Sequence, residues 1–312
     1  MNEPIDHHYL PVFYLSRWVR EDGRVYRFSR PNGNEVKVKP VVPKGTGYEP
    51  RLYEMSGMPP DRAQAMETDF LAALDSQAAL ALQMLERGIA ESDWTSSSRS
   101  GWSRFLLAQM LRAPEDIAQL KSSVSEDWSA AIPDIQRVYD EHRTEKDPVT
   151  VDEYFAQQNV GQVDELAFGV ARKLMNHPRI CSFINNMHWR VLSAIGTDAV
   201  LLTSDRPIWM TSTFIEEDAF ILMPIGPTNL FVASRSLSTL GQIEAKRRKT
   251  LVKEVNKLVV QHAVRFVYGT DKSILPFVQK HMSAMRHSTL LERVANMRNF
   301  KIVSSSSPFT SK

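Results

Sequence analysis

The sequence contains only one cysteine and no long apolar run, and these two absences restrict the class of protein. Cys181 is the single thiol among 312 residues, so the chain cannot form an internal disulfide, which is typical of a reducing compartment. No apolar stretch approaches the roughly 20 residues that a membrane-spanning helix needs. The first residues, MNEPIDHH, lack the basic and then apolar order of a secretory signal. We therefore expect a cytoplasmic protein.

Sequence motifs that indicate a zinc site, a nucleotide site or a catalytic serine are also missing. There is no paired-cysteine knuckle and no HExxH, which argues against a structural zinc site. There is no glycine-rich phosphate loop, no dinucleotide fingerprint and no GxSxG elbow. The formal net charge is +2, so the overall charge does not indicate a nucleic acid or an anionic membrane as partner, and only a local basic surface would.

What is present is the composition of an ordinary globular protein. Hydrophobic residues make up 43% of the chain and charged residues 24%, which is enough apolar content for a large core. We expect residues 1–300 to form one domain. The serine-rich residues 301–312 have too little apolar content to pack, and we expect them to be a disordered tail.

Helical periodicity dominates the middle and the C-terminal part of the sequence, where apolar residues recur every three or four positions. The helices expected from it span residues 61–88, 102–113, 115–178, 238–267 and 273–298. The third of these segments should be interrupted near Pro133 and Pro148, because proline removes a backbone donor and restricts the residue before it.

Strand signals occur in two separate places. Residues 24–39, RVYRFSRPNGNEVKVK, alternate on both sides of a PNGN turn and predict a hairpin. Short apolar segments between residues 187 and 235 predict three or four more antiparallel strands. We expect them to join the hairpin in one small sheet, which gives a mostly helical α+β fold.

Five motifs occur in an order that resembles a known family. They are HHYLPVFYLSRW, ETDFLAALD, QMLRAP, LLTSDRPIW and MPIGP. Together they are similar to the bacterial domain of unknown function 4238 family, over nearly the whole chain. The resemblance implies importance for His7 or His8, Pro11, Glu67, Gln109, Arg112, Pro114, Ser204, Asp205 and Pro207. It brings no chemistry with it, and Val12 and Arg206 stand where the family often has amides.

A histidine and an aspartate are the strongest candidates for catalysis. Asp205 follows Ser204 at the end of a predicted strand, where it could ligate a divalent metal, orient a histidine or act as a base. The alternative is a turn closed by local hydrogen bonds. Adjacent side chains of a strand point to opposite faces, so only one of His7 and His8 should face inward. We expect it to be His8, which shares its face with Leu10, and His7 to stand beside the site.

A glutamate and an arginine on neighbouring helices form the second candidate pair. Glu67 lies on the apolar stripe of its helix, so its carboxylate needs a partner. Arg112, three residues after Gln109, is the expected partner. A Glu67–Arg112 pair would be a structural clamp between helices, whereas an Arg112 that faces a cleft would bind an anion. Gln109 could complete either arrangement.

Two functions remain open on the sequence. In the first, His8, Asp205 and Glu67 catalyse phosphodiester hydrolysis, with Arg112, Gln109, Ser204 and His7 binding the substrate, as in a nuclease-like effector of defence or toxicity. In the second, these residues are a structural polar network, and an exposed surface binds a partner. The partner would be a nucleic acid, another protein or a second copy of the chain. The basic run EAKRRKTLVKEVNK is one such surface, although the solvated face of a helix is its more common role.

Overall fold

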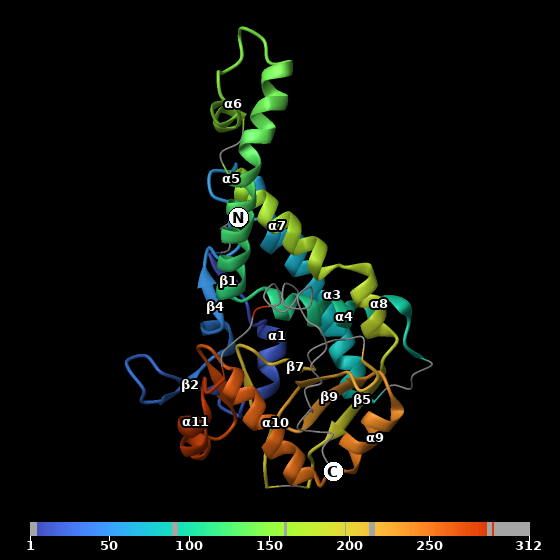
Figure 1. Ribbon diagram of the computed structural model, residues 1–312. Helices are drawn as coiled ribbons and strands as arrows, with labels where there is room; N and C mark the ends of the chain where they lie inside the picture. The colour runs from blue at the N-terminus through green and yellow to red at the C-terminus, as the bar shows by residue number, and fades with distance from the viewer. Residues whose placement is uncertain are drawn as a thin grey trace.

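The computed structural model describes residues 5–88, 93–158, 161–196, 198–211, 216–285 and 289 (Figure 1). The fold is α+β and mostly helical, as the sequence predicts. The predicted tail, residues 301–312, lies outside the described residues, as do residues 286–288 and 290–298 of the last predicted helix. None of the helices in the described ranges has both the length and the apolar character that crossing a bilayer requires.

The central helices pack as an antiparallel pair on which the N-terminal segment rests. A π-helical segment, η3 (Met66–Leu71), leads into α3 (Ala72–Glu86), and α3 packs against α4 (Ser96–Leu111). The other helices are α1 (Val12–Leu15), α2 (Pro60–Ala63), α5 (Pro114–His142), α6 (Val151–Gln158), α7 (Gln162–Met175), α8 (Pro178–Asn185), α9 (Leu237–Ala245), α10 (Arg248–His262) and α11 (Leu275–His281). Short 3₁₀ turns are η1 (Ser16–Trp18), η2 (Pro43–Gly45) and η5 (Lys272–Ile274).

The strands form separate sheets, whereas the sequence predicts a single one. A two-stranded sheet pairs β1 (Asp6–His8) with β4 (Tyr48–Pro50). A four-stranded sheet has the order β3 (Lys37–Val41), β2 (Val25–Ser29), β10 (Val267–Gly269), β6 (Thr203–Ser204). Another has the order β5 (His188–Ser193), β9 (Asn229–Ser234), β8 (Phe220–Pro224), β7 (Trp209–Met210). The predicted hairpin is therefore confirmed as β2–β3, but of the predicted strands between 187 and 235 only β6 lies in its sheet.

The N-terminal segment ties the two four-stranded sheets together. The hydroxyl of Tyr14 lies 2.7 Å from Oγ1 of Thr203 on β6 and donates to the carbonyl of Pro224 on β8 at 2.7 Å. The indole N–H of Trp18 donates to the carbonyl of Leu201 at 2.8 Å. Tyr14 and Trp18 are completely buried, so residues 9–18 are part of the core rather than a loose end.

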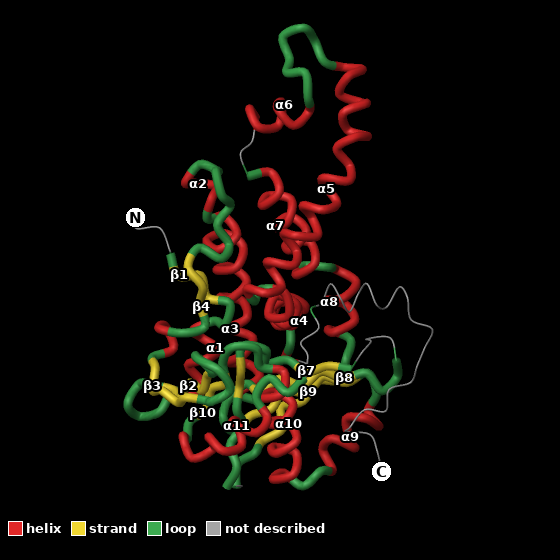
Figure 2. Tube along the Cα trace, turned by 60° about the vertical axis from the view of Figure 1, so that its left-hand side comes forward, coloured by secondary structure: helices red, strands yellow, loops and turns green. Residues whose placement is uncertain are grey.

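Helix α5 differs from its prediction, because it continues through Pro133 without interruption. Only residues of its first two turns are buried, and its outer half projects away from the rest of the molecule together with α6 (Figures 1 and 2). In a helix surrounded by water, the carbonyl that proline leaves unpaired can bond to solvent instead. The proline signal therefore does not end this helix.

Candidate functional site

The histidine pair lies on strand β1, and the two rings face opposite ways as predicted. His7 is the inward one, with no exposed surface. Its ring stacks on Tyr53 with centroids 5.6 Å apart, and its Nδ1 accepts the backbone N–H of Tyr53 at 2.9 Å. The expectation that His8 faces inward is wrong. Tyr9 and Leu10 are both buried in a bend after β1, so the two-residue alternation stops before Leu10.

His8 is half-buried at the edge of the same strand. Its Nε2 donates to the carbonyl oxygen of Lys44 at 3.1 Å, and its ring packs on Tyr48. Burial lowers the pKa of the imidazole, while the Lys44 carbonyl and the carboxylate of Asp6 oppose the change in part. The ring is therefore neutral near pH 7.

Arg112 forms a clamp between helices, but with Asp75 rather than with Glu67. The guanidinium is completely buried and contacts both oxygens of Asp75, at 2.9 and 3.3 Å, in a bidentate pair. The expected Glu67–Arg112 pair is wrong for a reason of register. Glu67 lies within η3, and the wider turn of this π-helical segment shifts Glu67 around the helix axis relative to Asp75 on α3.

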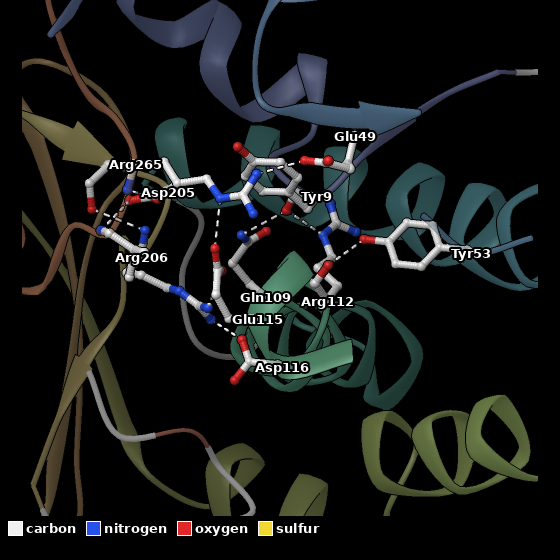
Figure 3. A network of polar contacts seen from close by, with 12 residues as sticks. Tyr9, Glu49, Tyr53, Gln109, Arg112, Glu115, Asp116, Asp205, Arg206 and Arg265 are labelled. Carbon is white, nitrogen blue, oxygen red and sulfur yellow. Dashed lines mark hydrogen bonds and ion pairs between the residues drawn. The ribbon is translucent and has the colours of Figure 1, made fainter. Parts of the chain in front are cut away.

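The backbone of Tyr9 is the point where these side chains meet. Its carbonyl accepts Nε of Arg112 at 2.9 Å and Nε2 of Gln109 at 3.0 Å. The carbonyl of Arg112 in turn accepts the hydroxyl of Tyr53 at 2.5 Å (Figure 3). The N-terminal segment, α4 and the stretch after β4 are thus joined by hydrogen bonds among buried groups. Gln109 completes the clamp, which is one of the two arrangements expected for it.

Glu67 lies outside the hydrogen bonds of the clamp. The carboxyl is half-buried in η3, and its Oε2 has no hydrogen-bond partner among the residues that the structure describes. Burial raises the pKa of this carboxyl to about 7, with Asp75 adding to the shift and Arg112 opposing it. A group that titrates there exists in both protonation states near neutral pH, which is the property of a general acid or base.

Asp205 is buried and bonded to backbone rather than to His8. Its Oδ1 accepts the N–H of Val264 at 3.1 Å, and its Oδ2 accepts the N–H of Arg265 at 2.6 Å. Burial raises the pKa of this carboxyl to about 6 despite those two bonds. The predicted contact between His8 and Asp205 is therefore not formed. Ser204 is likewise buried, and its hydroxyl accepts the N–H of Arg206 in a local turn, at 3.1 Å.

A chain of ion pairs, visible in Figure 3, extends from this strand end to the surface. Arg265 contacts Glu49 and Glu115, each at 2.6 Å. Arg206 contacts the other oxygen of Glu115 at 2.9 Å and also pairs with Asp116. No role was predicted for Arg206, and nothing in the sequence indicated Glu49, Glu115 or Arg265. The acidic first turn after Pro114 was a visible signal, but its partners are some ninety or more residues away.

In the described part of the chain, no group of three or more His, Cys, Asp or Glu side chains is arranged to hold a metal ion. The carboxylate expected to ligate a divalent metal, that of Asp205, is bonded to two backbone amides. The structure thus brings His7, Gln109 and Arg112 together around residues 7–9. Glu67 lies beside them, whereas Asp205 is bonded to the backbone of Val264 and Arg265. The catalytic roles of all these residues stay predictions.

A second candidate surface lies on α10 and α11, which are adjacent at the lower left of Figure 1. Lys253, Lys257 and Lys280 are exposed, and none has a carboxylate partner within the described ranges. Burial lowers the pKa of the His281 imidazole, and repulsion from these three lysines lowers it further. We call Lys249, Lys253, Lys257, Lys280 and His281 the α10–α11 basic surface.

A cleft of about 450 Å³ opens on this surface. Lys249, Lys253 and Asn256 line it from α10, and Phe277 lines it from α11. The ring of Phe277 lies 4.8 Å from that of His281. Lys249 contacts Asp198 at 3.5 Å, but both side chains are strongly exposed, at 73% and 96%. The surface therefore combines positive charge with an aromatic ring.

Comparison with known proteins gives the chain a family. The family described as Protein of unknown function (DUF4238) matches residues 6–273. The chain belongs to this family. The DUF4238 match begins in β1 and ends in η5, so it includes the clamp, the ion-pair chain and α10, and it stops before α11. No curated protein and no solved structure matches the chain.

Proposed function

We propose that the protein is a binding module that holds single-stranded nucleic acid on the α10–α11 basic surface. The observation that carries the proposal is the cleft beside Phe277, which two lysines line and around which two more lysines stand without carboxylate partners among the described residues. Single strands are held in general by a positive groove that follows the phosphates and by aromatic side chains on which bases stack.

The spacing of the lysines supports a repeating anion. Lys249, Lys253 and Lys257 follow one another at intervals of four residues, so they lie on one face of α10 and about 6 Å apart along its axis. Lys280 extends the charge onto α11. A single anion would be bound by one or two lysines. A phosphate backbone presents a series of negative charges, which a row of lysines along one helix face matches.

The state of the central polar residues also supports a binding role. Arg112 is completely buried, and its guanidinium is bonded to Asp75 and to the carbonyl of Tyr9, so it is not available to hold a phosphodiester. Asp205 is bonded to two amides. These groups hold segments of the chain together, which is the role expected of a structural polar network.

The proposal is tested with a fluorescently labelled 20-nucleotide single strand and anisotropy. Replacing Lys253, Lys257 and Lys280 by Gln should weaken binding at least tenfold. The matched control replaces three exposed cations far from α10, namely Arg137, Lys146 and Lys173, by Gln. It should bind within about twofold of the original protein. Equal affinity of both triple variants, or equally tight binding of a poly-glutamate peptide, would contradict the proposal.

A second candidate function, phosphodiester hydrolysis, is favoured by Glu67 alone. Its carboxyl has a pKa of about 7 and an unpartnered oxygen, and its segment η3 is π-helical, a feature frequent at functional sites. Neutral His8 would be the second proton carrier. If this function holds, Glu67→Gln and His8→Ala proteins should each stay folded, with no large fall in melting temperature, and lose cleavage of RNA or single-stranded DNA. Unchanged cleavage in both variants would rule it out.

A further inference from the structure

A second, larger cleft lies between α4 and α8, on elements that the α10–α11 basic surface does not use. Its volume is about 760 Å³, within the range of small-molecule sites. Its lining is basic and polar: it includes Arg99, Arg104, Ser96, Ser182, Asn176 and Asn186. No carboxylate is among the described residues that line it.

The wall of this cleft is held rigidly by hydrogen bonds. Arg99 donates through Nε to the carbonyl of Asn185 and through Nη2 to that of Met187, each at 2.6 Å, with its guanidinium 4.1 Å from the ring centroid of Trp189. The side chain of Asn185 accepts from Ser103 at 2.6 Å and donates to the Ser100 hydroxyl at 3.0 Å. A wall fixed in this way loses little entropy when a ligand binds.

Arg104 also lines the cleft, but it takes no part in the hydrogen bonds that hold the wall. It is half-buried, and the one hydrogen bond of its guanidinium within the described ranges is a long contact of 3.5 Å with Oε1 of Gln77. A guanidinium has five N–H donors in a planar fork that matches a phosphate or carboxylate. Most of its donors therefore remain for an anion that enters the cleft.

We propose that the α4–α8 cleft binds a small phosphomonoester or free phosphate. Arg104 would pair with two phosphate oxygens, and the hydroxyls of Ser96 and Ser182 would donate to the third. A phosphate presents three acceptor oxygens, so it uses more of these donors than a carboxylate does. This inference does not depend on the proposed function, because it concerns different helices.

The only cysteine of the chain makes the proposal testable. Cys181 lines this cleft and is 8% exposed, and burial raises the pKa of its thiol. Alkylation by iodoacetamide at pH 8.5, followed by mass spectrometry, therefore reports on the cleft alone. We expect 10 mM adenosine monophosphate, 10 mM inorganic phosphate or both to slow alkylation at least threefold. Slowing by phosphate alone identifies free phosphate as sufficient, and slowing by the nucleotide alone identifies an ester.

Variants of Arg104 separate specific binding from a general effect of salt. Because Arg104 also influences the thiol, each variant is compared with itself, with and without the probe at constant ionic strength. Arg104→Gln should lose the protection, Arg104→Lys should keep part of it, and Arg172→Gln on α7 should keep all of it. Melting curves should show that all three are folded. Equal alkylation rates with and without both probes, or undiminished protection in Arg104→Gln, would overturn the proposal.

Discussion

Glu67 shows at the scale of one residue how burial without a partner changes acid–base behaviour. Burial raises the pKa of its carboxyl from the ordinary value of 4.5 to about 7 in the folded protein. The folded state therefore binds a proton more tightly than the unfolded state. The resulting destabilisation is absent below about pH 4.5, grows as the pH rises between the two values, and is complete above about pH 7.

Replacing Glu67 by Gln should remove this destabilisation. We expect the free energy of unfolding at pH 8 to rise by about 1–3 kcal/mol, with little change at pH 4.5, because glutamine keeps the shape and carries no charge. Urea titrations at the two pH values measure the difference. Glu141→Gln, at an exposed position on α5, is the control and should change neither value. A variant that loses stability at pH 8 would show that the charged form has a partner.

Arg112 illustrates the opposite case, a buried charge in which each guanidinium nitrogen makes a hydrogen bond. Arg112→Met should leave the partly buried carboxylate of Asp75 without its cation and the carbonyl of Tyr9 with only Gln109. We expect a loss of about 3–5 kcal/mol in the free energy of unfolding. Arg137→Met breaks an exposed pair with Asp134 and should cost less than about 1 kcal/mol. Equal losses in the two variants would contradict the clamp.

The sequence indicated that Glu67 and Arg112 need charged or polar partners, but not which residues those partners are. A clamp was one of the two arrangements expected for Arg112, but helical spacing assigned it to Glu67 because nothing in the letters ETDFLAALD signals a π turn. Which histidine turns inward depended on a bend at Tyr9 and Leu10. A π turn or a bend changes which side chains come into contact. A prediction from periodicity assumes a regular helix or strand, so it misses such local changes of the backbone.

At the scale of elements, Asp205 joins the end of β6 to the connection between α10 and β10. Replacing it by Ala would leave the N–H groups of Val264 and Arg265 without acceptors inside the protein. We expect a loss of about 2–4 kcal/mol, and faster hydrogen exchange at these two amides than elsewhere in the sheet. Asp205→Asn keeps one oxygen and should lose less. Unchanged exchange at both amides in Asp205→Ala would contradict the anchoring role.

Long elements were predictable and short ones were not. The β2–β3 hairpin, α3 and α4 follow from alternation and helical periodicity over many residues. The division into two four-stranded sheets depends on β10, three residues, and β6, two residues, which are too short to give a pattern. Helix α5 passes through Pro133 because solvent surrounds it there, and exposure is a property of the fold rather than of the local sequence.

At the scale of the whole molecule, a net charge of +2 conceals an uneven distribution. The acidic side chains of the ion-pair chain neutralise arginines near the centre, while the lysines of α10 and α11 stand at the surface. The overall charge therefore gives no indication of a nucleic-acid partner, and the proposal of one depends on the local arrangement of the lysines. Polar residues at the centre hold the scaffold, and we propose that the exposed lysines bind the single strand.

The salt dependence of single-strand binding tests this division of roles most directly. For single strands, the logarithm of the association constant falls with the logarithm of the salt concentration, with a slope of about −0.7 for each phosphate contact. We predict a negative slope for the original protein and a slope shallower by about 2 for the Lys253, Lys257 and Lys280 triple variant. A slope near zero in the original protein, or the same slope in the triple variant, would contradict binding on the α10–α11 basic surface.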